Sequence, residues 1–143
     1  MRRHALALAT LGALTLTGCG VALQLGGDPK SQLCEQYCDE LEQLDEIRCT
    51  TSDVHTCAST LTEKVMLAHS VNDALANEPM SDEVERVHAK VTLVSSPGER
   101  FGNNKCFEEG ANVGDKLFRC RQIAQDIDER FAELVEQVRK LPA

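Results

Sequence analysis

The sequence predicts an all-α protein, a small four-helix bundle with one long Gly/Asn-rich loop and about three disulfides. Apolar residues recur at intervals of three and four in four separate segments, which is the spacing of a helix with one buried face. No segment has the apolar–polar alternation of a convincing strand. The chain has 143 residues and seven cysteines, a length that suits one domain and a cysteine content that suggests an oxidising compartment.

The first two helices are predicted over residues 29–48 and 53–77. Asp28 supplies an N-cap acceptor and Pro29 occupies the first helical position, so the first helix begins there. Residues 50–53 form a cluster of N-cap residues that starts the second helix, and Pro79 follows its end. The apolar face of the first helix consists of Leu33, Cys34, Tyr37, Cys38, Leu41 and Leu44, and that of the second of Val54, Cys57, Ala58, Leu61, Val65, Ala68, Val71 and Leu75.

Ser81 is the expected N-cap of a third helix, which ends near residue 94. Residues 95–114 contain Pro97 and four glycines and are predicted to form a long loop. The last helix is predicted over residues 115–141, where apolar residues alternate steps of three and four without a break. That regularity also suits a dimeric coiled coil, although a helix of a globular bundle is the commoner cause.

The first residues indicate export. Two arginines near the start are followed by an apolar stretch over residues 5–16, which is too short to cross a bilayer but typical of a secretory signal peptide. Leu16, Thr17, Gly18 and Cys19 then resemble the lipobox of bacterial lipoproteins, whose cysteine is the lipidated residue.

This resemblance implies three regions, a signal peptide over residues 1–18, a lipidated Cys19 with a tether to residue 28, and a helical domain over residues 29–143. Removal of residues 1–18 takes away Arg2 and Arg3 and no acidic residue, so the formal charge changes from −8 to about −10. Such acidity argues against a nucleic-acid partner. Gly20 follows the cysteine where an Asp would resemble an inner-membrane retention signal, which favours the outer membrane in a Gram-negative source.

Six cysteines remain for disulfides if Cys19 is lipidated: Cys34, Cys38, Cys49, Cys57, Cys106 and Cys120. A Cys49–Cys57 bridge is expected to join the end of the first helix to the start of the second. A bridge within one helical turn strains a regular helix, so Cys34 and Cys38 are each expected to pair elsewhere, with Cys106 and Cys120 in an undetermined order. A Cys106–Cys120 bridge is the main alternative. It would leave Cys34 and Cys38 to pair with Cys49 and Cys57.

The same cysteines could instead bind zinc or copper with His55, although their spacings match no metal-binding family. The acidic row of Glu35, Asp39, Glu42 and Glu46 is interpreted as a solvated face, with a basic partner or a divalent cation as the alternative. His55, His69 and His88 are interpreted as surface or boundary residues. Oxygen ligands around Glu108, Asn112 and Asp115 suggest a calcium site as a further alternative, although the spacing of an EF-hand is missing.

No segment carries a recognised catalytic or phosphate-binding motif. The sequence therefore predicts a non-enzymatic envelope lipoprotein without a cofactor, held at the membrane by its N-terminal lipid. Binding or scaffolding of an envelope protein through its surface is the expected role. A binder of metal or of a small ligand is the alternative, and an enzyme is the third possibility.

Overall fold

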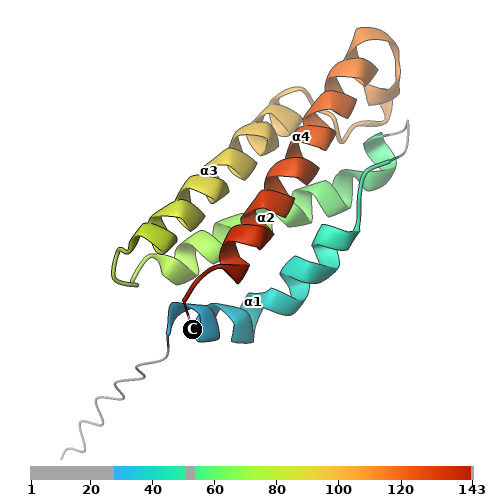
Figure 1. Cartoon of the computed structure of the whole chain (residues 1–143). Coiled ribbons are helices and arrows are strands. Elements are labelled where there is room, and N and C mark those ends of the chain that lie inside the picture. Colours follow the sequence, from blue (N-terminus) through green and yellow to red (C-terminus); the bar gives the residue numbers. More distant parts are fainter. Residues whose placement is uncertain (1–27, 51–53, 143) are drawn as a thin grey trace, which may run out of the picture.

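A computed structural model of the protein describes residues 28–50 and 54–142, and within them every regular element is helical. Four long helices, α1 (Pro29–Glu46), α2 (Ala58–Leu75), α3 (Asp82–Asn103) and α4 (Gly114–Arg139), pack together (Figure 1). Two short 3-10 helices, η1 (Val54–Cys57) and η2 (Glu109–Asn112), precede α2 and α4. The predicted all-α bundle is confirmed. The signal peptide, Cys19, most of the tether and residues 51–53 lie outside the described residues.

α1 begins as its sequence predicts. The Asp28 side chain accepts a hydrogen bond of 2.7 Å from the backbone N–H of Ser31, and Pro29 occupies the first turn. This cap satisfies one of the backbone donors that every helix leaves free at its start. α1 ends two residues before the predicted end, because Ile47 takes an extended backbone conformation.

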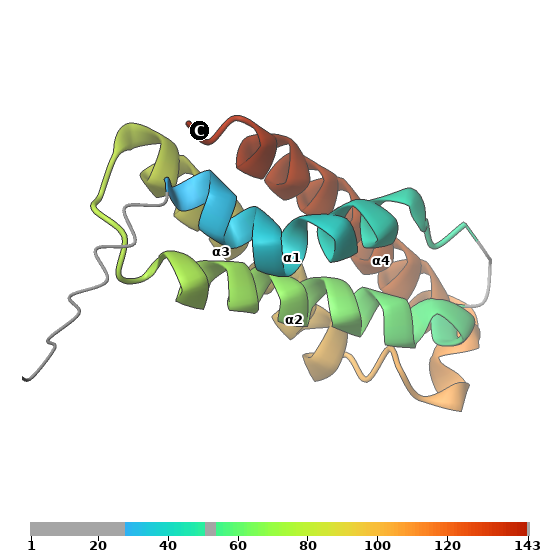
Figure 2. The same ribbon diagram turned by 90° about the horizontal axis from the view of Figure 1, so that it is seen from below.

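α1 lies between α2 and α4 (Figure 2), and α3 packs along α4. α1 and α4 run in opposite directions. At one end the Lys30 ammonium donates to the backbone carbonyl of Arg139 over 2.8 Å, and at the other Arg48 donates to the carbonyl of Asp128 over 3.0 Å. The start of α1 therefore lies beside the end of α4.

The buried residues form two clusters, one near each end of the bundle. The cluster beside the start of α1 includes Leu33, Val71, Val84 and Leu134, and the cluster at the other end includes Val54, Phe101, Cys106 and Ile127. From Cys120 to Leu141 the predicted apolar positions of the last helix are buried within this one chain. Burial in the bundle accounts for its regular spacing without a coiled-coil partner.

The predicted end of the third helix near residue 94 is wrong, because α3 continues to Asn103 with Pro97 inside it. A proline removes one backbone donor and crowds the preceding turn. The apolar face nevertheless continues past it, since Val94 is fully buried and Phe101 is 4% exposed. Burial of this extra length outweighs the local penalty, and the loop shortens to residues 104–113. It closes at Gly114, whose φ of +58° suits a residue without a side chain.

The six cysteines form three pairs, Cys34–Cys38, Cys49–Cys57 and Cys106–Cys120, with Cα–Cα distances of 4.3, 5.7 and 5.5 Å. The Cys49–Cys57 pair agrees with its prediction. The expected pairing of Cys34 and Cys38 with Cys106 and Cys120 is wrong. The alternative is right about Cys106–Cys120, but it is wrong in pairing Cys34 and Cys38 with Cys49 and Cys57.

The antiparallel arrangement of α1 and α4 explains this correction. The Lys30–Arg139 contact places Cys34 near the end of α4, whereas Cys120 lies near its start. Cys34 lies four residues beyond Lys30, so it is level with about residue 135 of α4, roughly 15 residues of helix from Cys120. That separation corresponds to about 22 Å at 1.5 Å per residue. A disulfide needs Cα atoms within about 7 Å, so Cys34 cannot reach Cys120 in this fold.

Candidate functional site

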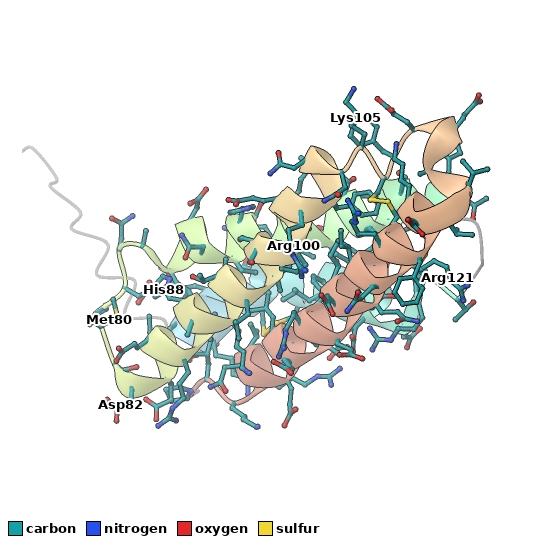
Figure 3. All side chains as sticks on the ribbon, turned by 90° about the horizontal axis from the view of Figure 1, so that it is seen from above. Met80, Asp82, His88, Arg100, Lys105 and Arg121 are labelled. Atoms are coloured by element: carbon teal, nitrogen blue, oxygen red, sulfur yellow. A yellow bond between two sulfur atoms is a disulfide. The ribbon has the colours of Figure 1, made fainter. Side chains whose placement is uncertain are left out.

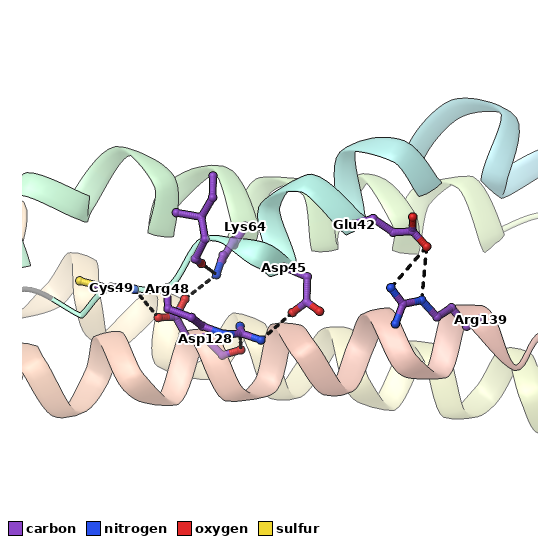
Figure 4. Close-up of polar contacts among 8 residues, drawn as sticks. Glu42, Asp45, Arg48, Cys49, Lys64, Asp128 and Arg139 are labelled. Atoms are coloured by element: carbon purple, nitrogen blue, oxygen red, sulfur yellow. Dashed lines mark hydrogen bonds and ion pairs between the residues drawn. The ribbon is translucent and has the colours of Figure 1, made fainter.

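A lysine on α2 is completely removed from solvent. Lys64 has an exposed fraction of 0%, and its Nζ lies 2.5 Å from Oδ1 of Asp128 and 2.6 Å from the carbonyl oxygen of Ile47 (Figure 4). The ring of Phe131 lies 5.4 Å from the same nitrogen, within the range of a cation–π contact. Burial lowers the pKa of the Lys64 amine, and the hydrogen bond and charge of Asp128 oppose that shift.

Asp128 connects α4 with the segment that follows α1. Its Oδ2 accepts a hydrogen bond of 2.8 Å from the backbone N–H of Cys49, and its own carbonyl accepts from Arg48. The Arg48 guanidinium also pairs with Asp45 at 2.9 Å. These contacts satisfy both oxygens of a carboxylate that is largely buried. Because Lys64 is enclosed, its amine is unavailable to a substrate, and the pair connects α2, α4 and the end of α1.

A polar cleft of about 510 Å³ adjoins this pair, and Asp128 is one of its lining residues. Arg48, Arg121, Gln125 and Glu129 also line it. Arg121 is exposed and projects from α4 (Figure 3). A guanidinium beside amide and hydroxyl groups, as Arg121 has in Gln125 and Thr50, is suited to hold a small carboxylate or phosphate. Asp128 and Glu129 bring carboxylates to the same cleft, and Arg48 is already paired with Asp45.

A second hollow, of about 250 Å³, has an apolar lining. It lies between α2 and α3, and its residues are Thr62, Val65, Met66, Gly98, Phe101, Gly102, Phe107 and Ile127. Met66 is 64% exposed and Phe107 is 51% exposed, so two large apolar side chains border it in contact with water. We call these eight residues the α2–α3 groove.

Two glycines of α3 shape the α2–α3 groove in different ways. A Cβ at Gly98 would lie 2.8 Å from both Cγ atoms of Val65, so this glycine permits the close approach of α2 and α3. A Cβ at Gly102 would meet no atom within 4 Å, so the space above it is open. Such an apolar hollow is suited to receive an apolar side chain of another molecule.

The predicted acidic row is partly engaged in ion pairs. Glu42 lies 3.3 Å from the Arg139 guanidinium, so it contributes to the contact between α1 and α4 (Figure 4). Glu35, Asp39 and Glu46 are exposed. The prediction of a solvent-facing acidic row is therefore correct for these three residues. It does not include the ion pair that Glu42 makes with Arg139.

The three predicted histidines lie in separate contacts. The His55 Nδ1 lies 2.7 Å from the carbonyl oxygen of Phe107, and the His88 Nδ1 lies 2.7 Å from the Asn72 amide oxygen. The His69 Nε2 lies 3.3 Å from the Ser95 hydroxyl. Among the described residues, no group of three or more His, Cys, Asp and Glu side chains could hold a metal ion. The suggested zinc or copper site is therefore not assembled among those residues. The suggested calcium site includes Asn112, whose side chain lies outside the described part of the structure.

Lys64 and Asp128 are not among the site residues that the sequence predicts. Lys64 lies three residues after Leu61 and four before Ala68, and Asp128 lies four after Ala124 and three before Phe131. Each charge thus occupies a position of the buried face of its helix. A charged residue at such a position is the signal that would have found the pair.

Comparison of the chain with known protein families, curated proteins and solved structures finds no match. No helix in residues 28–50 and 54–142 is both long and apolar enough to cross a membrane. Three cysteine pairs at disulfide distance are consistent with an oxidising, extracytoplasmic location.

Proposed function

We propose that the protein is a lipid-anchored lipoprotein of the bacterial envelope that binds or scaffolds another envelope protein without catalysing a reaction. The observation that carries this proposal is the order of features at the N-terminus. Two arginines, an apolar stretch over residues 5–16 and the Leu16–Cys19 motif follow one another as in a lipoprotein signal. Cys19 would carry the lipid.

The shape of the bundle suits an anchored domain. Asp28 begins the first helix nine residues after Cys19, and an extended tether of that length spans roughly 30 Å. The loop over residues 104–113 lies at the opposite end of the molecule (Figure 1). The domain would stand on its tether with that loop directed away from the lipid.

The α2–α3 groove supports binding through the surface. Met66 and Phe107 each expose about half of their side chain or more, and large apolar residues are enriched where proteins contact each other. We therefore expect the protein partner to contact the domain here.

Substitution of the lipobox cysteine tests the anchor. In Cys19→Ala we expect loss of metabolic labelling by a radioactive fatty acid, together with an uncut precursor or release of the protein from the membrane fraction. Gly20→Ala keeps the cysteine and is the matched control, which should be labelled and membrane-bound. Unchanged labelling and fractionation of Cys19→Ala would reject lipidation. In a Gram-negative host, Gly20→Asp should redirect the protein to the inner membrane.

Crosslinking in the native envelope tests the partner. A photo-reactive amino acid at position 66 should give a defined protein adduct, which mass spectrometry then identifies. Position 80 is the control, because Met80 is 70% exposed and lies at the opposite end from Lys105 (Figure 3). Absence of an adduct at position 66, or an equal yield of the same adduct at position 80, would contradict binding at the α2–α3 groove.

The polar cleft favours one second candidate, a binder of a small anionic ligand. Succinate or inorganic phosphate should then raise the melting temperature of the protein in a dose-dependent way. Arg121→Gln should remove this effect. Arg86→Gln should keep it, because Arg86 lies 4.0 Å from Glu83 and does not line the cleft. An unchanged melting temperature with both anions would rule out this candidate for them.

A further inference from the structure

The three disulfides differ in what they connect. Cys106 and Cys120 are both 0% exposed and join the loop before η2 to α4. Cys49–Cys57 joins the segment after α1 to η1. Cys34 and Cys38 both lie in α1 and are four residues apart. The first two pairs hold separate segments together, and the third holds only one turn of a helix.

α1 has other interactions that keep it in place. Asp28 caps its start, and Leu33, Leu41 and Leu44 bury their side chains against the other helices. A regular α-helix places Cα atoms four residues apart at about 6 Å, whereas those of Cys34 and Cys38 are 4.3 Å apart. The reduced cysteines would therefore fit a regular turn of α1, and we expect the fold to persist without this bond.

This pair is also within reach of other molecules. Cys34 and Cys38 are both partly exposed, and the neighbouring Glu35 and Asp39 are fully on the surface. Among the described helices, α1 is covered only by α2 and α4, so its outer side faces water. Cys38 additionally touches the core cluster beside the start of α1. Part of Cys34 and of Cys38 is thus in contact with water, whereas the Cys106–Cys120 pair is completely buried.

We propose that Cys34–Cys38 is a thiol–disulfide exchange site that accepts two electrons from a protein dithiol. A thiolate of the dithiol attacks one of the two sulfur atoms, the bond between Cys34 and Cys38 breaks, and the released cysteine sulfur takes up a proton. The second thiol of the partner, as its thiolate, then attacks the mixed disulfide and releases the other cysteine of α1. The partner leaves with a new disulfide, and α1 holds two thiols.

Graded reduction of the intact chain tests the site. The detergent-extracted protein is incubated in buffers of increasing ratio of reduced to oxidised glutathione, and free thiols are alkylated and mapped by mass spectrometry. We expect Cys34 and Cys38 to be alkylated at a ratio at least tenfold lower than that needed for Cys106 and Cys120. Circular dichroism should show unchanged helix content after this first step.

A stoichiometric amount of reduced thioredoxin, as a model protein dithiol, should reduce Cys34–Cys38 and become oxidised itself. The Cys34→Ser/Cys38→Ser variant should keep its helix content and oxidise clearly less thioredoxin than the original chain, although it retains the partly exposed Cys49–Cys57 pair. The Cys106→Ser/Cys120→Ser variant is the matched control and should still oxidise it. If that control variant fails to fold, the thiol mapping of the intact chain after thioredoxin treatment decides instead.

Three results would overturn the proposal. Cys34–Cys38 could be reduced no earlier than Cys106–Cys120, its reduction could coincide with loss of helix, or thioredoxin could leave it oxidised. None of these measurements depends on the lipid anchor or on the α2–α3 groove, so the exchange site can fail while the proposed function stands.

Discussion

The ammonium group of Lys64 lies 2.5 Å from a carboxylate oxygen of Asp128, and neither side chain is more than 8% exposed (Figure 4). The two residues come from α2 and α4, and Asp128 also accepts the backbone N–H of Cys49. The correct folding of the segment after α1 is thus linked to a charge pair between two other helices. Desolvation makes such a pair a weak source of net stability, but one that is costly to break.

Removal of one partner should therefore destabilise the protein strongly. We expect Asp128→Ala to lower the free energy of unfolding by about 3–5 kcal/mol, because it leaves the buried ammonium of Lys64 without its carboxylate. Urea denaturation followed by circular dichroism measures the change.

Two variants serve as controls for the buried pair. Lys90→Met breaks the partly exposed pair of Lys90 with Glu133 and should cost about 1 kcal/mol or less. Lys64→Met/Asp128→Leu replaces both charges and should be less destabilised than Asp128→Ala alone. An Asp128→Ala variant no less stable than Lys90→Met would show that the pair is unimportant for folding.

The sequence predicts the buried face of α2 but not the Lys64–Asp128 pair that lies on it. The apolar spacing of Leu61, Ala68 and Val71 correctly places the buried face of α2, because burial of that face is what keeps the helix in the bundle. Lys64 lies on the same face, but the apolar pattern does not include a lysine. Its partner is 64 residues away, and only the packed fold brings the two together.

The disulfides and α3 show two other limits. The rule that a bridge does not form within one turn excluded the Cys34–Cys38 pair. The expected pairing with Cys120 is prevented instead by the antiparallel order of an up-and-down bundle, which places Cys34 and Cys120 at opposite ends. Pro97 indicated a helix end, yet tertiary burial of Phe101 extends α3 past it. In both cases a local rule was overridden by packing between helices, which local spacing does not determine.

The close contact of α2 and α3 at Gly98 makes this position sensitive. We expect Gly98→Ala to lower the free energy of unfolding by about 1–3 kcal/mol, because its Cβ would lie 2.8 Å from the Val65 methyl groups. Val65→Ala in the same chain should recover part of that loss by making room. Thermal and urea unfolding of the single and double variants provide the measurement.

Gly102→Ala is the matched substitution one helical turn further along α3. Its Cβ would meet no atom within 4 Å, and alanine is the better helix former by up to about 1 kcal/mol. We expect this variant to be as stable as the original protein or slightly more so. Equal losses at positions 98 and 102 would contradict the tight contact with Val65.

The cap of α1 should respond to acid. The hydrogen bond from the Ser31 backbone N–H holds the pKa of Asp28 below its ordinary value of 3.8. A carboxyl whose pKa is lower in the folded state stabilises the folded protein at pH values above its unfolded-state pKa. This contribution is lost as the pH falls through its folded-state pKa. The amide resonance of Ser31 should therefore shift with a midpoint below 3.8. Asp28→Asn keeps an acceptor that does not titrate, so its amide should show no such shift.

The Cys106–Cys120 bond should contribute more to stability than the Cys34–Cys38 bond. It closes a segment of 14 residues, and a loop of that size is worth about 3 kcal/mol in the chain-entropy model. We expect Cys106→Ala/Cys120→Ala to lower the free energy of unfolding by about that amount, with a further loss from the two buried sulfur atoms. The Cys34–Cys38 bond closes no segment between elements. Cys34→Ala/Cys38→Ala should therefore lower the free energy of unfolding clearly less in the same urea titration. If Cys34→Ala/Cys38→Ala lost more free energy of unfolding than Cys106→Ala/Cys120→Ala, the one-turn bridge would support the fold. That result would argue against a reducible site in α1.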